Sequence, residues 1–320
     1  MGRKVHLIPF EVVKTLEAVS EVPKGVEMIQ APKMWQQSRG KGITVAILDT
    51  GCDITHPDLK ERIIGGRNFT NDDEGNPDVY TDYVGHGTHV AGTIAAVENQ
   101  AGVVGVAPEA NLLIVKVLGQ QGSGLYEWII QGILYAVEQR VDIISMSLGG
   151  PDDVPELHQA VQTAVANGIP VICAAGNGGD GQDSTHEFDY PGSYNEVISV
   201  GSVSLERRSS PFSNSNNEVD LVAPGEKILS TFLHGEYAAL SGTSMAAPHV
   251  SGAMALIKVL ANSSFGRHLT ERELYAQLIK RTVPLQNSPQ VEGNGFLYLT
   301  TADKLADIFA EQSVAKLGNL

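Results

Sequence analysis

Cysteine is scarce in this chain, which has only Cys52 and Cys173 among its 320 residues. Both lie inside apolar runs (TVAILDTGC and IPVICAAG), so we expect two buried free thiols rather than a disulfide. A chain that builds no disulfide framework fits a reducing compartment. These observations favour a cytoplasmic protein.

Long apolar runs are also missing from the sequence. No segment reaches the roughly 18 uninterrupted apolar residues of a membrane-spanning helix. The apolar run that begins at Val5 is interrupted by Pro9 and ends at Glu11, whereas a secretory signal needs roughly 7–15 apolar residues. We therefore expect neither a membrane partner nor export by the general secretory route.

Basic residues are outnumbered by acidic ones. The chain has 22 Lys and Arg against 37 Asp and Glu, which gives a net charge of −15. Such a charge argues against nucleic acid as a partner. It suits solubility at neutral pH and the binding of divalent cations.

Apolar, β-branched runs alternate with helical patterns along much of the chain. Runs that are apolar on both faces are typical of parallel strands covered by helices. The expected strands are 43–49, 111–118, 141–149, 169–177 and 196–203, and the expected helices are 86–97, 125–139 and 156–168. The pattern predicts an α/β fold with a doubly wound, mostly parallel sheet, helices on both faces, and ligands at the carboxyl ends of the strands.

Two further helices are expected toward the C-terminus. The segment 243–261 (TSMAAPHVSGAMALIKVLA) has no polar face, which is typical of a helix buried at the centre of a domain. In residues 300–312, Leu305, Ile308 and Phe309 recur at helical spacing. We expect this second helix to pack on its own domain, and a contribution to a homodimer is the alternative.

Three segments carry groups that together could make a hydroxyl nucleophilic. Asp49 ends a strand in LDTGCD, His86 opens a helix in GHGTHVAG, and Ser244 begins the buried helix in GTSMAAPHVSG. A serine hydroxyl needs a base to take its proton, and the base needs a carboxylate to hold its tautomer and stabilise the imidazolium. Taken singly, Asp49 could cap a turn and Ser244 could cap a helix.

Together these motifs resemble those of the subtilisin family of serine endopeptidases, which has the same chain order of Asp, His and Ser. The resemblance runs from about Gly25 to about Ile308. It implies that Ser244 is the nucleophile, His86 the general base and acid, and Asp49 the orienting carboxylate. It also implies an acyl-enzyme mechanism and protein or peptide substrates.

Three other functions agree less well with the same residues. A zinc site on His86 and His89 lacks the general-base Glu of the HExxH motif. A phosphate-binding loop at AGNGGDG would need a helix directly after its glycines, and GDGQDSTHEF follows instead. A catalytically silent peptide binder would lack a member of the triad, and none is missing.

The resemblance also assigns an oxyanion hole. GNGG (176–179) follows an expected strand, and the family places an amide side chain at this point. Asn177 would therefore donate to the developing oxyanion, together with the backbone N–H of Ser244. The hydroxyl of Thr243 is expected to support the same pocket.

Glycine-rich edges are expected to bind the substrate as an added β-strand. GSG at 122–124 and SLGG at 147–150 resemble the two strands that clamp an extended peptide in the family. Tyr126 and Leu148 would line an apolar subsite several residues before the cut. The residues assigned to substrate binding are Gly122, Gly124, Tyr126, Ser147, Leu148, Gly149, Ala174, Gly176 and Asp189.

Asp189, in DYPGSY, departs from the small residue that secreted family members commonly have at the base of the main specificity pocket. Facing inward, its carboxylate would favour a basic or polar residue before the scissile bond. Turned to solvent, it would have no such effect.

The family resemblance further implies a structural calcium ion. The segment 98–108 interrupts the helix that begins at His86 and offers oxygen ligands of the kind that calcium prefers. A glutamine near the N-terminus joins this site in the family, and its apparent equivalent here is near Ser20, so either Ser20 or another residue would complete the site. The expected ligands are the carboxylate of Asp58, the side chain of Asn99 and the carbonyls of Val97, Ala101 and Val103, with a weaker cation site at the carbonyls of Gly192, Tyr194 and Val197.

The chain divides into an N-terminal extension at 1–24, a catalytic domain at 25–310 and a tail at 311–320. The extension is similar to that of intracellular subtilisins, which carry a related short motif. Here the motif is Leu7, Ile8, Pro9 and Phe10.

We expect this extension to inhibit the enzyme by lying in its own active-site cleft. An extended apolar strand can add to the glycine-rich edges of the groove. Pro9 has no N–H and a fixed φ, so it should disturb pairing near the scissile position. Activation would then require cleavage between about Glu11 and Val22. A strand that only packs on the domain is the alternative.

Overall fold

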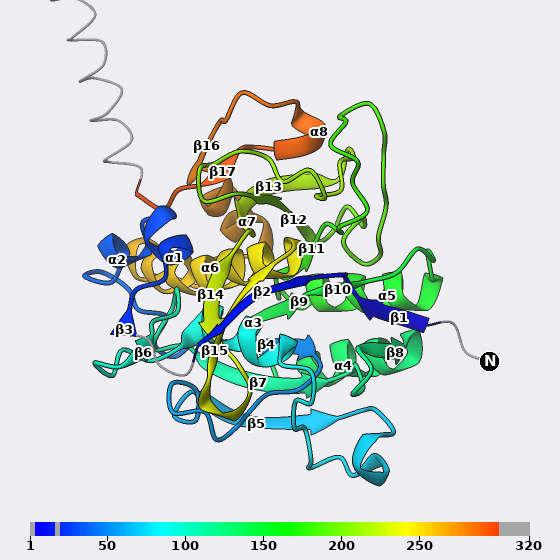
Figure 1. Cartoon of the computed structure of the whole chain (residues 1–320). Helices are drawn as coiled ribbons and strands as arrows, with labels where there is room; N and C mark the ends of the chain where they lie inside the picture. Colours follow the sequence, from blue (N-terminus) through cyan, green and yellow to red (C-terminus); the bar gives the residue numbers. More distant parts are fainter. Residues whose placement is uncertain (1–3, 17–19, 301–320) are drawn as a thin grey trace, which may run out of the picture.

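Nine strands form one large sheet in the part of the chain that the computed structural model describes, residues 4–16 and 20–300 (Figure 1). The strand order is β16-β17-β13-β12-β11-β9-β4-β7-β5, and every neighbouring pair is parallel except β16 with β17. The bounds are β4 Thr44–Asp49, β5 Ile63–Asn68, β7 Asn111–Lys116, β9 Ile143–Met146, β11 Val171–Ala174, β12 Ile198–Val203, β13 Val219–Pro224, β16 Thr282–Val283 and β17 Phe296–Leu297. The predicted doubly wound, mostly parallel sheet is confirmed.

The strands at the centre of this sheet are the ones that the apolar runs predicted. In β9, β11 and β12 every residue is buried, because helices cover both faces of the sheet. Strand β5 was not predicted from the sequence. Its run IIGGRN is partly exposed and contains two glycines and an arginine, so it lacks the pattern of a buried strand.

Helices cover the two faces of the sheet in two layers (Figure 1). Helices α3 and α6 pack in one apolar cluster, and α4 and α5 pack in the other. The bounds are α1 Lys24–Met28, α2 Ala31–Met34, α3 His86–Ala95, α4 Tyr126–Glu138, α5 Pro155–Ala166, α6 Thr243–Phe265, α7 Glu271–Ile279 and α8 Pro289–Glu292, with short 3-10 helices η1 Asp72–Gly75 and η2 Leu233–Gly235.

Helix α6 is the buried central helix that the segment 243–261 predicted, and it runs on to Phe265. Contrary to our expectation of no such segment, its length and composition would suffice to cross a membrane, but 83% of its apolar window is buried inside the protein. It is therefore a core helix. The expected helix at 300–312, with Leu305, Ile308 and Phe309, lies outside the described residues.

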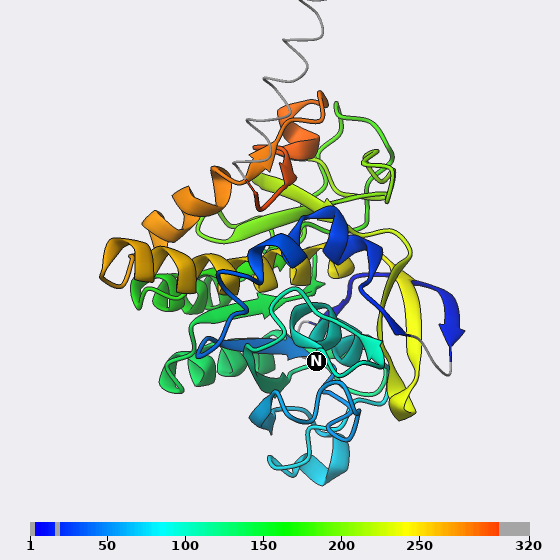
Figure 2. The same cartoon turned by 90° about the vertical axis from the view of Figure 1, so that its left-hand side faces the viewer.

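The N-terminal extension contributes strands to three smaller sheets. Strand β1 (Lys4–Leu7) lies between β8 (Ser123–Leu125) and β10 (Leu148–Gly149), antiparallel to both. The remaining pairs are β2 (Glu11–Leu16) with β15 (Tyr237–Ser241), which also pairs with β14 (Ile228–Thr231), and β3 (Ser20–Glu21) with β6 (Gly102–Val103). Figure 2 shows the dark blue strand β2 of the extension beside the yellow strand β15. The described parts of the extension thus run across the face of the molecule as extended strands (Figure 1).

Candidate active site

Asp49, His86 and Ser244 reach the site from three different elements. Asp49 is the last residue of β4, His86 is the first residue of α3, and Ser244 lies in the first turn of α6. All three are fully buried. The candidate site therefore lies at the carboxyl end of the sheet, where a doubly wound fold places its ligands.

The ring of His86 is held by Asp49 and covered by Phe10. Nδ1 of His86 donates to Oδ1 of Asp49 at 2.8 Å, which leaves Nε2 as the acceptor nitrogen. Among the described residues, Nε2 has no hydrogen-bond partner, and the hydroxyl of Ser244 donates to the carbonyl of Ser147 at 3.2 Å. The ring of Phe10 lies 4.9 Å from that of His86, centroid to centroid.

A second buried carboxylate, Asp82, orders the loop that leads to His86. Its Oδ1 accepts hydrogen bonds from the backbone N–H groups of Val84 and Gly85, and its Oδ2 accepts two from Thr88. The hydroxyl of Thr50 also donates to Oδ1 at 2.9 Å, so Asp82 joins the turn after Asp49 to the start of α3. We did not predict this role. The available signal was an Asp shortly before a helix, where its side chain commonly binds local N–H groups.

Lys116 was also missed by the sequence analysis. It is fully buried, and its Nζ donates to the carbonyl of Thr50 at 2.7 Å and pairs with Asp72 at 3.1 Å. Asp72 in turn accepts from the backbone N–H of Gln120 at 2.9 Å. The ammonium group thus links the turn after Asp49 to Asp72, and Asp72 in turn binds the loop before β8.

The amide of Asn177 is oriented by Thr243 and points into the groove. Its Oδ1 accepts from the backbone N–H of Thr243 at 2.9 Å and from the Thr243 hydroxyl at 2.7 Å. Its Nδ2 is therefore free to donate, and it donates to the carbonyl of Pro9 at 2.5 Å. An amide held in this way can donate to a carbonyl oxygen that gains negative charge.

The groove beside these residues is filled by strand β1. Val5 pairs with Gly124, His6 pairs with Gly149, and the N–H of Leu7 donates to the carbonyl of Gly122 at 2.7 Å. Both glycine-rich edges that the sequence analysis assigned to binding thus contact the same strand.

Two apolar side chains of the extension are buried in this groove. Val5 is fully buried in the same apolar cluster as Tyr126 and Leu148. Ile8 is 3% exposed, and its Cγ1 would lie 3.5 Å from a Cβ at Gly149. Residues predicted to form the apolar subsite and residues predicted to form the main pocket therefore both lie against the extension.

Asp189 lies against Gly149 and Gly176, two other residues that the sequence assigned to substrate binding. Its Oδ2 accepts from Nδ2 of Asn214 at 3.1 Å, and a Cβ at Gly176 would overlap the same carboxylate oxygen. Burial raises the pKa of Asp189, and the bond from Asn214 partly offsets this rise. Asn214 was missed, because nothing in its local sequence distinguishes it.

Ala174 and Ser147 are the remaining assigned residues, and Ser147 contacts Ser244 directly. Ala174 is buried at the end of β11, and the hydroxyl of Ser147 donates to the carbonyl of Ser244 at 2.9 Å. These contacts hold the strand ends against the start of α6.

The loop expected to bind calcium folds around Asp58. Its carboxylate accepts from Nδ2 of Asn99 at 2.9 Å, from the N–H of Val103 at 3.0 Å and from the hydroxyl of Tyr237 at 3.1 Å. The N–H of Val97 donates to the carbonyl of Asp58 at 2.9 Å. The carboxylate of Asp58 and the side chain of Asn99 thus lie side by side at this loop, and oxygen donors of this kind fit a hard cation.

Ser20 lies next to this loop, on the strand β3 that pairs with β6. Its hydroxyl donates to the carbonyl of Gln100 at 3.3 Å. Ala101 donates its N–H to Oδ1 of Asn99 at 3.2 Å. Ser20 thus supports the loop through a hydrogen bond.

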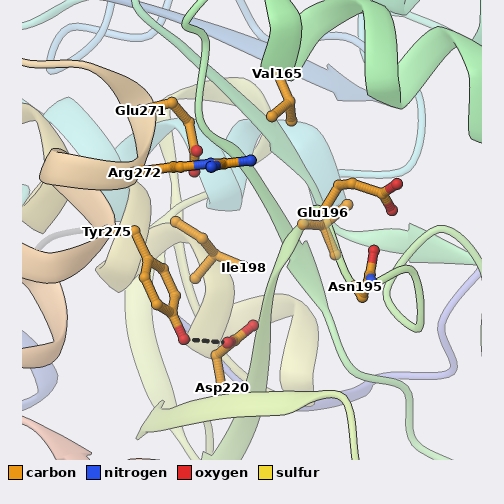
Figure 3. A pocket seen from close by; sticks show the side chains of 9 residues that line it. Val165, Asn195, Glu196, Ile198, Asp220, Glu271, Arg272 and Tyr275 are labelled. Carbon is orange, nitrogen blue, oxygen red and sulfur yellow. Dashed lines mark hydrogen bonds between the residues drawn. The ribbon is translucent and has the colours of Figure 1, made fainter.

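The residues of the weaker candidate cation site share one turn. The N–H of Val197 donates to the carbonyl of Tyr194 at 3.2 Å, and Gly192 lies just before them. An adjacent hollow of about 490 Å³ includes Val197 in its lining. Figure 3 shows the acidic and basic side chains that line this hollow, with Arg272 reaching into it.

Asp220 lines the same hollow. Burial raises its pKa to about 6, and it accepts from the hydroxyl of Tyr275 at 2.6 Å (Figure 3). Because the guanidinium of Arg272 also lies in the hollow, the hollow itself is a poor site for a cation.

Neither His89 nor the cysteines take part in the site. Nε2 of His89 lies 2.8 Å from the carbonyl of Ile228 and 3.1 Å from that of Ala238, and burial lowers its pKa to about 3. Within residues 4–16 and 20–300 no cluster of three His, Cys, Asp or Glu could hold a metal. Cys52 and Cys173 are free and buried, as predicted, and burial raises the pKa of both thiols.

A doubly wound sheet with an Asp, a His and a Ser at these places is typical of subtilisin-type serine peptidases. The chain belongs to the subtilase family, whose family model matches residues 40–299. It is 70% identical over 315 residues to the intracellular serine protease of Paenibacillus polymyxa, with 98% of this chain and 97% of that protein covered.

Two relatives from Bacillus subtilis (strain 168) extend the comparison. The chain is 62% identical over 315 residues to the major intracellular serine protease, with 98% of each chain covered. It is 48% identical over 242 residues to subtilisin E, with 75% of this chain and 62% of that protein covered. The chain is thus a serine endopeptidase, and the two similar proteins of nearly equal length support a cytoplasmic location.

Proposed function

We propose that this endopeptidase is a calcium-stabilised zymogen, held inactive by its N-terminal extension and activated when the extension is cut away. The observation that carries the proposal is the strand β1, which lies between the two glycine-rich edges of the groove beside His86 and Ser244. The chain would therefore inhibit itself by occupying its own substrate cleft.

In the active enzyme, Ser244 Oγ attacks the carbonyl carbon of the scissile bond. Nε2 of His86 takes the hydroxyl proton and gives it to the leaving amine, while Asp49 stabilises the imidazolium. Nδ2 of Asn177 donates to the oxyanion of the tetrahedral intermediate. Water then hydrolyses the acyl-enzyme with His86 again as the base.

The carbonyl that meets Asn177 lies one residue beyond the carbonyl of the bond presented for cleavage. This one-residue offset would make the extension resist cleavage at the motif. Ile8 is the buried residue beside Asp189, so the bond after Ile8 would be the one presented for cleavage. The amide of Asn177, however, binds the carbonyl of Pro9. The carbonyl of Ile8 then lacks this donor, and Pro9 cannot pair through an N–H.

The covalent tether makes modest contacts sufficient. A segment joined to its site by a short chain has an effective concentration that reaches about the millimolar range. Once the extension is cut, this advantage is lost, and the segment can leave the cleft.

Calcium and Asp189 complete the proposal. A cation held by Asp58, Asn99 and nearby carbonyls would stabilise the loop between α3 and β7. The carboxylate of Asp189, beside Ile8, would favour a basic or polar residue before the scissile bond. A second cation would bind more weakly at the carbonyls of Gly192, Tyr194 and Val197.

The first experiment is an intact-mass time course of the full chain in calcium, with Ser244→Ala as the matched control. We expect the wild type alone to lose about twenty N-terminal residues while hydrolysis of a quenched peptide rises. Full hydrolysis from the first time point without a change of mass would refute autoinhibition. Neither truncation nor hydrolysis would instead favour the catalytically silent peptide binder.

Pro9→Ala tests the role of the offset. The variant gains an N–H and a freer φ, so its extension should adopt the register of a substrate. We expect faster loss of the extension, with a new cut within the motif, measured by the same time course. A Pro9→Ala protein that is neither cut at the motif nor changed in activity would refute inhibition by register.

A further inference from the structure

Lys116, the last residue of β7, places a buried cation beside the turn that follows Asp49. Strands β4 and β7 are parallel, and Asp49 pairs with Lys116 where both strands end. The side chain of Lys116 is 0% exposed. Burial of an ammonium group is costly even when the group is paired. A lysine at this place therefore requires a reason beyond solubility.

Thr50 connects this ammonium group to the triad. Its carbonyl accepts from Nζ of Lys116 at 2.7 Å, and its N–H donates to Oδ1 of Asp49 at 2.7 Å. The same Oδ1 accepts from Nδ1 of His86 at 2.8 Å. The hydroxyl of Thr50 accepts from the N–H of Gly87 at 3.0 Å. The carbonyl that Lys116 holds thus belongs to the residue that orients both Asp49 and the start of α3.

Acidic side chains surround the same turn. Asp49 and Asp82 are both buried, and nearby carboxylates favour the protonated form of a histidine, which cannot act as a base. Among residues 4–16 and 20–300, Lys116 is a basic side chain that contacts this turn. The other titratable groups around the turn and His86 are Asp49, Cys52, Asp53, Asp72, Asp82, Tyr83 and His89.

We propose that Lys116 is a positioning residue of the triad, which holds Thr50 in place and keeps His86 unprotonated at neutral pH. Its positive charge offsets the effect of the two buried carboxylates on the imidazole. Asp72 limits this effect, because its carboxylate pairs with the ammonium group at 3.1 Å. The inference concerns the base of the free enzyme and does not depend on autoinhibition or on calcium.

The pH profile of kcat/KM tests the inference, because its acidic limb reports protonation of the base in the free enzyme. The full chain is incubated in calcium until the hydrolysis of a quenched peptide reaches a constant rate. In Lys116→Met, which keeps much of the apolar volume of the side chain, we expect the acidic limb to move to higher pH by about half a unit. In Asp72→Asn, which leaves the ammonium group without its counter-charge, we expect the limb to move to lower pH.

Opposite shifts distinguish an effect of charge from a merely structural one. Loss of packing or of a hydrogen bond would lower the plateau of kcat/KM without moving the limb, whose position does not depend on the fraction of active enzyme. Asp78→Asn removes a charge from an exposed position that also precedes α3. It should leave the limb in place, because water and salt screen an exposed charge.

The two variants decide the matter separately. A limb that does not move to higher pH in a folded and active Lys116→Met would overturn the inference. So would a limb that stays in place or moves to higher pH in Asp72→Asn. If Lys116→Met is inactive or does not fold, the direction of the shift in Asp72→Asn alone decides.

Discussion

Asn177 and Thr243 act as a pair at the scale of single residues. Thr243 makes two hydrogen bonds to Oδ1 of Asn177, so the orientation of the amide does not depend on a bound substrate. A donor that is already oriented stabilises a developing charge without the cost of reorganisation.

Asn177→Ala should lower kcat with little change in KM, because the donor acts mainly on the tetrahedral intermediate. Loss of the corresponding side chain in subtilisin costs about 10²–10³ in kcat, and we expect the same scale here. Steady-state kinetics of the activated enzyme provide the measurement, with Asn195→Ala as a control far from the triad. An unchanged kcat would remove Asn177 from the oxyanion hole.

Asp189 should make the choice of substrate depend on pH. Burial raises the pKa of its carboxyl, so its negative charge develops at a higher pH than in an exposed Asp. We expect the ratio of kcat/KM for peptides with Arg before the cut to that for Leu peptides to rise with pH. Asp189→Asn should flatten this rise, and Glu187→Gln, a nearby acidic control, should not. A strong preference for Leu at every pH would contradict this role.

Helix α6 shows how an element combines chemistry with burial. Its first turn carries Ser244, and its following turns are buried as far as Ile257. His249 lies in this buried part, where Nδ1 contacts the carbonyl of Met245 at 2.8 Å and burial lowers the pKa to about 4. The helix therefore carries a neutral histidine into the core.

His249 should make the protein less stable in acid. The unfolded chain takes up a proton at the ordinary pKa near 6.5, while the folded chain does not until about pH 4. Stability from this residue is thus present above pH 6.5 and is lost as the pH falls toward 4.

The expected loss between pH 7 and pH 5 is about 2 kcal/mol. Urea unfolding of Ser244→Ala, which avoids autolysis, should show this loss, and the same protein with His249→Gln should show less. Equal pH dependence in the two proteins would refute the assignment.

At the scale of the whole molecule, the loop around Asp58 joins distant parts of the chain. It receives a bond from Tyr237 of β15 and pairs with β3 of the extension through β6. A cation bound there would stabilise the contacts between the catalytic domain and the end of the extension.

Removal of calcium should therefore lower the Tm of the full chain. A ligand at 100 times its Kd stabilises a folded protein by about 2.7 kcal/mol, which scanning calorimetry of Ser244→Ala can detect. Asp58→Asn should abolish most of the shift that calcium causes, and Asp78→Asn, at an exposed site, should leave it unchanged. The same calcium shift in both variants would place the ion elsewhere.

The sequence alone predicted the five central strands of the sheet, and its motifs assigned Asp49, His86 and Ser244 to the ends of buried elements. Central strands are apolar on both faces because helices cover them, and the motifs around Asp49, His86 and Ser244 are local. The edge strand β5 was missed, because an exposed strand does not need an apolar pattern. The contacts of Asp82 and Lys116 could not be predicted, because both join segments far apart in the sequence.

The motif Leu7 to Phe10 also has features that the sequence predicts and features that only the tertiary structure decides. Its apolar residues and its proline are read directly from the sequence, and they indicate a strand with one missing donor. Which residue occupies the pocket and which carbonyl meets Asn177 depends on pairing with β8, β10 and β15. Strand register is decided by these long-range partners, so only the tertiary structure shows Ile8 beside Asp189 while the carbonyl of Pro9 binds Asn177.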